Sequence, residues 1–155
     1  MSYSGKFSPT NPNKYNGDHT KIVFRSSWEL SFMRWLDMNP DVDTWVSEET
    51  VIPYISPVDD RQHRYFVDFK VKFKNGKVLL IEIKPDHQTK KPVAKKGKKR
   101  STLLLEAQTY GVNWAKWKAA ERYAEARGWK FAVFTEHTLK GLGIKIPSTQ
   151  PRGKR

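Results

Sequence analysis

The sequence predicts an α/β fold with a central mixed sheet, and two observations carry this prediction. Two segments rich in β-branched and aromatic residues, 61–73 and 77–84, flank Asn75-Gly76. This dipeptide is the strongest short-range signal for a hairpin. Apolar residues recur at helical spacing before the hairpin, in 26–38, and after it, in 101–127. The expected order is helix, three strands, helix, strand and a final helical turn.

The first helix is predicted over residues 26–38. Ser26 is followed three residues later by Glu29, which has the form of a capping box. Pro40 then ends the helical region. Residues 1–20 are rich in Pro, Asn, Ser and Gly, so we expect an irregular N-terminal segment there. The inward face of the helix is predicted to carry Trp28, Phe32, Trp35 and Leu36.

The remaining elements follow from composition. Residues 44–55 look extended and are interrupted by Pro53, and residues 129–136 form a short, largely apolar strand. Between them lies the helix 101–127, which Gly111 could divide and Gly128 would end. A last helical turn is expected over 137–144. The inward positions expected on the long helix are Leu104, Leu105, Tyr110, Trp114, Trp117 and Ala124.

The length of 155 residues indicates one domain, with a core over 24–135. The absence of cysteine excludes disulfides and thiolate metal sites. No apolar run approaches the ~20 residues that span a bilayer. The first 17 residues are polar, so no secretory signal is expected, and the cytoplasm is the expected place of synthesis.

The net charge of +13 is unevenly distributed. Residues 86–100 carry seven Lys and Arg against one Asp, and residues 140–155 carry five and no acid, which leaves only +2 elsewhere. Such blocks bind polyanions by releasing counterions from phosphate, so we expect nucleic acid as a partner. A solubilising charge run, or an acidic protein surface as partner, is the alternative. The basic loop 86–100 and the basic tail 147–155 are both expected to be mobile.

Two acids interrupt the predicted hairpin. Asp68 lies midway along an otherwise apolar strand, where burial and β-propensity disfavour it. Glu82 and Lys84 alternate on the next strand and share a face. Two or three carboxylates suffice for Mg²⁺, and a neighbouring lysine can orient water or stabilise a phosphorane. A plain ion pair on a solvated strand is the competing interpretation.

The hairpin register decides whether these acids meet. A two-residue turn at Asn75-Gly76 would set Asp68 opposite Ile83 and Glu82 opposite Phe69, with the acids on different faces. A one-residue bulge would correct this, and "FKNGK" at 73–77 has room for one. We therefore expect the hairpin to contain a bulge or a register that brings Asp68 and Glu82 together.

Together these motifs resemble the PD-(D/E)xK nucleases, whose restriction-endonuclease-like core has the order αβββαβ. "RSSWE" at 25–29, "VD" at 67–68 and "EIK" at 82–84 are similar to its helix acid, strand acid and E-x-K elements, although Val67 stands where that family usually has Pro. "YSGKF", "WLDMNP", "VIPY", "RYFVDF", "IEIKP" and "WKAAERYAEARGWKF" more closely resemble the head-completion nucleases of T-even-type phages. A more distant resemblance is to TnsA-type endonucleases.

The resemblance implies a metal-dependent DNA nuclease that acts on packaged DNA in head completion and head–tail joining. Endonuclease activity is the main expectation, and exonuclease activity is an additional one. It implies Mg²⁺ as cofactor, with Mn²⁺ as a substitute, and phage head, portal or neck proteins as partners. It also implies a place in the host cytoplasm or in the virion. The implied catalytic residues are Glu29, Asp68, Glu82 and Lys84, the first three also holding the metal.

The DNA-binding candidates are Arg25 and the cations of the basic loop, which are Lys95, Lys96, Lys98, Lys99 and Arg100. A non-catalytic DNA-binding or head–tail joining protein on a nuclease-like scaffold is the alternative function. His63 and His87 are expected at the surface. Trp114 and Trp117 are expected in the core.

Overall fold

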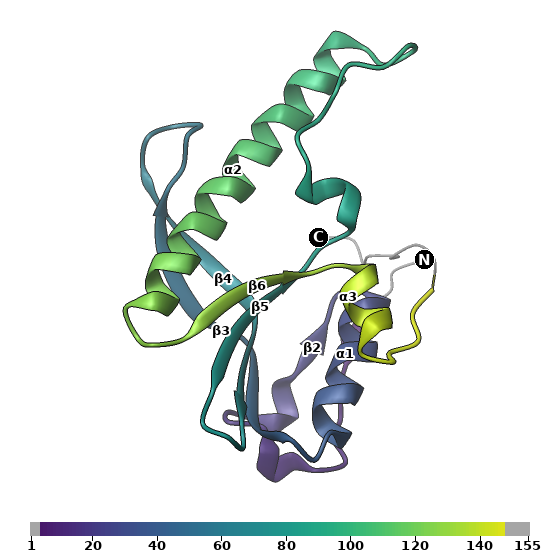
Figure 1. The fold of residues 1–155 in the computed structure, drawn as a ribbon, viewed down its shortest axis with the longest axis vertical. Coiled ribbons are helices and arrows are strands. Elements are labelled where there is room, and N and C mark those ends of the chain that lie inside the picture. The colour runs from purple at the N-terminus through teal and green to yellow at the C-terminus, as the bar shows by residue number, and fades with distance from the viewer. Residues whose placement is uncertain (1–3, 148–155) are drawn as a thin grey trace.

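The structure, a computed structural model, describes residues 4–147. Its centre is a four-stranded sheet in the order β3-β4-β5-β6 (Figure 1). The strand β5 pairs antiparallel with β4 and parallel with β6, so the sheet is mixed, as predicted. The strands are β3 (Val42–Ile55), β4 (Gln62–Phe73), β5 (Val78–Ile83) and β6 (Lys130–Phe134).

Within the described part of the chain, three α-helices accompany the sheet. They are α1 (Ser27–Met38), α2 (Arg100–Glu125) and α3 (Glu136–Gly141). The order α1, β3, β4, β5, α2, β6 is that of a restriction-endonuclease-like core, which confirms the predicted fold class. Within residues 4–147, none of the helices combines the length and the apolarity that crossing a membrane requires.

The strand β5 is apolar on both faces because each face is covered. Ile81 and Ile83 belong to a core cluster that includes Phe32 of α1. Leu80 belongs to a second cluster with Ala120 and Ala124 of α2. A strand buried on both sides reads as a continuous apolar run, and Glu82 is the charged exception within it.

The N-terminal segment is more ordered than its composition predicts. A short strand β1 (Gly5–Lys6) pairs with β2 (Val23–Phe24), and single 3₁₀ turns cover Pro12–Lys14 and His19–Lys21. The buried carboxylate of Asp37 accepts backbone N–H groups of Thr10 and Asn11 at 2.8 and 2.9 Å. These contacts to α1, together with the buried side chains of Phe7 and Tyr15, hold the segment against the core.

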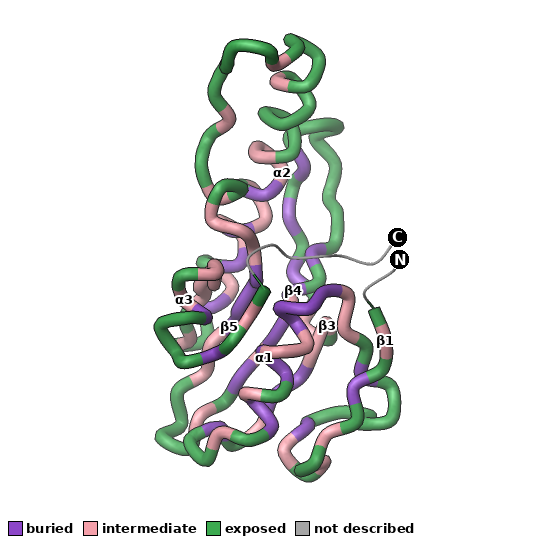
Figure 2. The backbone as a smooth tube through the Cα atoms, turned by 90° about the vertical axis from the view of Figure 1, so that its right-hand side faces the viewer, coloured by how far each residue is buried: buried purple, intermediate pink, exposed green. Residues whose placement is uncertain are grey.

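The prediction for α2 is wrong in two respects. The helix runs unbroken through Gly111, because glycine in a helix costs only about 1 kcal/mol. Leu104, Leu105 and Trp114 are 59%, 64% and 50% exposed instead of buried, whereas Trp117 is buried as expected. The start of α2 projects beyond the sheet, so Leu104 and Leu105 have no strand to pack against, and Trp114 lies on a half-exposed side of the helix (Figures 1 and 2).

The predicted basic loop 86–100 contains a 3₁₀ turn, Asp86–Thr89, and its last residue begins α2. Figure 2 shows that most of this segment and the adjoining part of α2 is exposed. The basic tail lies outside the described residues from 148 onward.

Candidate active site

The hairpin between β4 and β5 sets the geometry of the acids. Its strands pair Phe69 with Ile81 and Val71 with Leu79. The amide of Phe73 donates to the carbonyl of Lys77 at 2.8 Å, so the loop has three residues, 74–76. Gly76, at φ 87°, takes the left-handed conformation that such a loop requires.

This register differs from that of a two-residue turn by one residue. Continued one pair beyond Phe69 and Ile81, it sets Asp68 opposite Glu82. The register therefore puts the two acids on the same face of neighbouring strands, and the Asp68 carboxylate lies beside the amide of Ile83, the residue after Glu82. The expected shift of register is confirmed.

Glu82 is buried and held at both oxygens. The hydroxyl of Tyr65 donates to its Oε1 at 2.7 Å, and the indole N–H of Trp117 donates to its Oε2 at 2.8 Å. Burial, followed by the charge of Glu82, strongly raises the pKa of Tyr65, so the phenol stays protonated and acts as donor. These contacts fix the carboxylate between β4 and α2.

Asp68 lies where the pairing of β4 and β5 ends. Its Oδ2 accepts the backbone N–H of Ile83 at 2.8 Å. Burial, then the charges of Glu82 and Glu29, raise the pKa of Asp68 well above its usual value, although the bond from Ile83 and the cation of Lys84 oppose this. The local negative charge is therefore only partly balanced by the protein.

Glu29 lies at the start of α1 and belongs to the same group. Its backbone N–H donates to Ser26 Oγ at 3.2 Å, and its Oε1 accepts the backbone N–H of Arg25 at 3.1 Å. It thus helps to cap the helix and also adds to the charge around Asp68. The two interpretations of Glu29, as cap and as member of the acidic site, are compatible.

Lys84 lies close to this acidic group. Its Nζ is 3.8 Å from Glu82 Oε2, and its side chain is 19% exposed. The backbone N–H of Lys84 donates to Phe134 of β6 at 3.0 Å, which anchors the residue just after β5. The lysine therefore lies within reach of both solvent and carboxylate.

The residues fit a hard divalent cation in donor chemistry. Carboxylate oxygens are the ligands that Mg²⁺ prefers, and a cation would offset both the burial and the neighbouring acidic charges that raise the pKa of Asp68. Among residues 4–147, however, no three acidic or histidine side chains are arranged to hold one ion together. The fit is therefore that of a pair of carboxylates, Asp68 and Glu82, completed by water.

Arg25 faces another acid. Its Nη1 bonds Glu48 Oε1 and Oε2 at 2.6 and 2.8 Å, which raises its pKa. Glu48 has φ 55° and lies at a register shift of β3, between Ser47 and Thr50. The charges of Glu29 and Asp68 also act on Arg25, so its guanidinium borders the acidic group.

The sequence did not single out Tyr65, Trp117 or Glu48 for the site. Tyr65 is an ordinary strand residue by its pattern, and Trp117 looks like a core residue. The one signal for them was the position of Glu82 in an otherwise apolar strand. A buried carboxylate needs hydrogen-bond donors around it. Both predicted surface histidines are exposed, and His63 pairs with Asp59 at 2.8 Å.

The cations of the basic loop do not all have the same environment. Lys95, Lys96, Lys99 and Arg100 are exposed. Lys98 instead donates to the Val93 carbonyl at 3.0 Å and to Glu106 Oε1 at 2.7 Å. Lys98 therefore ties the loop to α2, whereas the other four face solvent.

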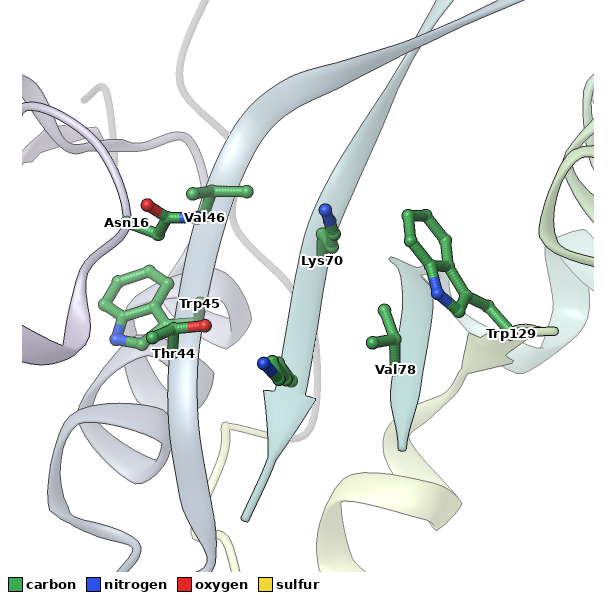
Figure 3. A pocket seen from close by; sticks show the side chains of 8 residues that line it. Asn16, Thr44, Trp45, Val46, Lys70, Val78 and Trp129 are labelled. Atoms are coloured by element: carbon green, nitrogen blue, oxygen red, sulfur yellow. The ribbon is translucent and has the colours of Figure 1, made fainter. Parts of the chain in front are cut away.

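A separate hollow of about 370 Å³ lies on the sheet (Figure 3). It includes Lys70, whose Nζ is 4.5 Å from the centre of the Trp129 ring. None of the acids described above lines it. The acidic group between β4, β5, α1 and α2 is thus the candidate active site.

Comparisons with known proteins agree with the resemblance seen in the motifs. The chain is 45% identical to the head completion nuclease of Enterobacteria phage T4 over 150 residues, which cover 94% of this chain and 99% of that protein. No solved structure matches the chain. The TnsA-like endonuclease N-terminal family matches residues 39–136, a segment that contains Asp68, Glu82 and Lys84. The chain therefore belongs to the TnsA-like endonuclease N-terminal family.

Proposed function

We propose that this protein is a metal-dependent DNA nuclease that acts in phage head completion. A nuclease role is supported by the family and by the relative named for head completion. The single observation that carries the metal-dependent chemistry is the meeting of Asp68 and Glu82 across β4 and β5, with Lys84 3.8 Å from Glu82.

In this proposal, Asp68 and Glu82 hold Mg²⁺, with Mn²⁺ as a substitute, and Glu29 contributes through the surrounding charge or through water. When bound, the ion supplies a Lewis acid and lowers the pKa of a coordinated water. Tyr65 and Trp117 keep the Glu82 carboxylate in one orientation, as partners of metal ligands commonly do.

Lys84 has the second chemical role. Hydrolysis forms one P–O bond from water and breaks another, and negative charge grows on the phosphoryl oxygens during this step. An ammonium group beside the carboxylates can orient the attacking water and stabilise that charge. Arg25 is our candidate for a contact to a neighbouring phosphate, because its guanidinium borders the acidic group.

The DNA itself is held by the exposed cations Lys95, Lys96, Lys99 and Arg100. We expect packaged DNA as the substrate, phage head, portal or neck proteins as partners, and the host cytoplasm or the virion as location. A non-catalytic joining protein would share the basic segment. It would not need a buried acid, Asp68, whose pKa is raised by burial and then by the charges of Glu82 and Glu29.

The test is an assay of supercoiled plasmid DNA with the full-length protein. We expect nicking or linearisation with Mg²⁺, and loss of both with EDTA or in the Asp68→Ala variant. Circular dichroism of the variant checks that it folds. Equal behaviour of the three samples would reject the enzyme and leave the joining protein.

A further inference from the structure

The structure contains a projecting segment whose use the proposed chemistry does not explain. This basic arm comprises the loop 86–99 and the first ten residues of α2, 100–109. Nine of these ten helical residues are exposed, and Leu103 is half-buried. The chain on each side of the arm leads to a residue that contacts Glu82. Lys84 precedes the arm in the sequence, and Trp117 follows it. The arm therefore extends from the candidate active site itself (Figure 1).

The charge of the arm favours one kind of partner. It carries seven cations against two acids. Each acid is already paired, Asp86 with Lys90 at 3.1 Å and Glu106 with Lys98 at 2.7 Å. The remaining cations face solvent, and a polyanion such as DNA matches them.

The arm also exposes apolar side chains among these cations. Leu104 and Leu105 are 59% and 64% exposed, on one turn of a helix that nothing else covers. Exposure of leucine side chains to water is unfavourable, so two neighbouring exposed leucines indicate a surface that is buried when a partner binds. A partner that attracts the cations and also accepts leucines is DNA whose bases are separated by an apolar wedge.

We propose that Leu104 and Leu105, which lie ~20 Å along α2 from Trp117 at 1.5 Å per residue, form a wedge that unstacks bases of the bound DNA several base pairs from the cleavage site. This proposal rests on the nuclease function above and specifies its substrate class. Unstacking costs least where base pairing is already interrupted, so the preferred substrate is duplex DNA with a mismatch or a branch. The cations of the arm then contact the phosphates on either side.

Binding in EDTA tests the wedge apart from the chemistry, because no cleavage can occur. The probe is a duplex with 2-aminopurine beside a central two-base mismatch, and its fully paired counterpart. For the wild-type protein we expect a rise in 2-aminopurine fluorescence on binding and about tenfold tighter binding to the mismatched duplex.

The Leu104→Ala/Leu105→Ala variant should lose the fluorescence rise and the preference, yet bind the paired duplex within about threefold of wild type. Alanine is the best helix former, so α2 should persist. Met38→Ala, an exposed apolar residue of α1, is the matched control and should behave as wild type.

A wild-type protein that binds both duplexes without unstacking would overturn the wedge, as would a double variant equal to wild type. The leucines would then be left for a protein partner. The plasmid assay reports separately on the nuclease, so a protein that unstacks DNA without cutting it would refute the proposed function and retain the wedge.

Discussion

The hydroxyl of Tyr65 on β4 donates a hydrogen bond of 2.7 Å to Oε1 of Glu82 on the neighbouring strand β5. Tyr65 is 3% exposed and Glu82 is 6% exposed, so the bond is shielded from water. A buried carboxylate is held in one orientation by the donors that satisfy it. The orientation of Glu82 is therefore set by residues that take no part in the chemistry.

Tyr65→Phe should separate this positioning role from folding. Loss of the hydroxyl should cost about 1–3 kcal/mol of stability, because Glu82 loses a buried donor. Cleavage and Mg²⁺ affinity should each fall by about 10- to 100-fold, the usual effect of removing a partner of a metal ligand. Tyr54→Phe, in the same core cluster, is the control and should change neither. Unchanged Mg²⁺ titrations for Tyr65→Phe would contradict the role.

Two tryptophans on α2 give a second matched pair. Trp117→Phe removes the donor to Glu82 Oε2 and should lower the cleavage rate by about tenfold or more. Trp114→Phe changes a half-exposed ring three residues away and should stay within about twofold. Steady-state cleavage of one plasmid substrate measures both. Similar rates for the two variants would mean that the Trp117 hydrogen bond has no catalytic importance.

Asp68→Asn should stabilise the metal-free protein while abolishing cleavage. The folded pKa of Asp68 is raised, so the charged carboxylate costs stability above its unfolded pKa. That cost is complete above the raised folded pKa, shrinks as pH falls from the folded towards the unfolded pKa, and is gone below the unfolded pKa. Asparagine can still accept the Ile83 amide and carries no charge.

We expect a gain on the order of 1 kcal/mol at pH 7, or about 2–4 °C in Tm for a chain of this size. The gain should shrink at lower pH. Mg²⁺ should raise the Tm of the wild type more than that of the variant. A lower Tm for Asp68→Asn in EDTA at pH 7 would show that Asp68 is not under electrostatic strain.

The cations of the basic arm should divide into two groups. Changing Lys95, Lys96, Lys99 and Arg100 to Ala should weaken DNA binding at low salt and flatten its salt dependence, by up to about 0.9 in slope for each phosphate that is no longer neutralised. Lys98→Ala removes a tie between the loop and α2, so it should loosen the arm. Hydrogen exchange of residues 93–106 should then be faster. An unchanged slope in the fourfold variant would indicate a protein partner for the arm.

The fold could be predicted from the sequence because its elements have strong local patterns. Asn75-Gly76 marked the hairpin, and the apolar runs of β4 and β5 marked a covered sheet. The register could not be predicted in the same way, because Asn-Gly fits both a two-residue turn and the three-residue loop that forms. That one residue decides whether Asp68 and Glu82 meet.

The surroundings of the acids were less accessible to sequence reasoning. Trp114 and Trp117 lie three residues apart on one helix, and the sequence predicts both to be in the core. Trp114 is 50% exposed, whereas the indole N–H of Trp117 donates to Glu82. Which face of α2 meets the sheet is a property of packing between distant segments. The same limit applies to Leu104 and Leu105. Their apolar pattern predicts burial, but the sheet does not extend far enough to cover them.

The most direct test of the account is single-turnover cleavage by Lys84→Ala, with Mg²⁺ binding measured on the same sample. As a plain ion pair with Glu82, Lys84 would contribute at most about 1 kcal/mol to stability and little to cleavage. As a charge-stabilising or water-orienting group, its loss should slow cleavage by about 100-fold or more while Mg²⁺ still binds. Lys77→Ala, in the same hairpin and exposed, should cut at the wild-type rate. A Lys84→Ala protein that cuts DNA as fast as wild type would contradict the central claim.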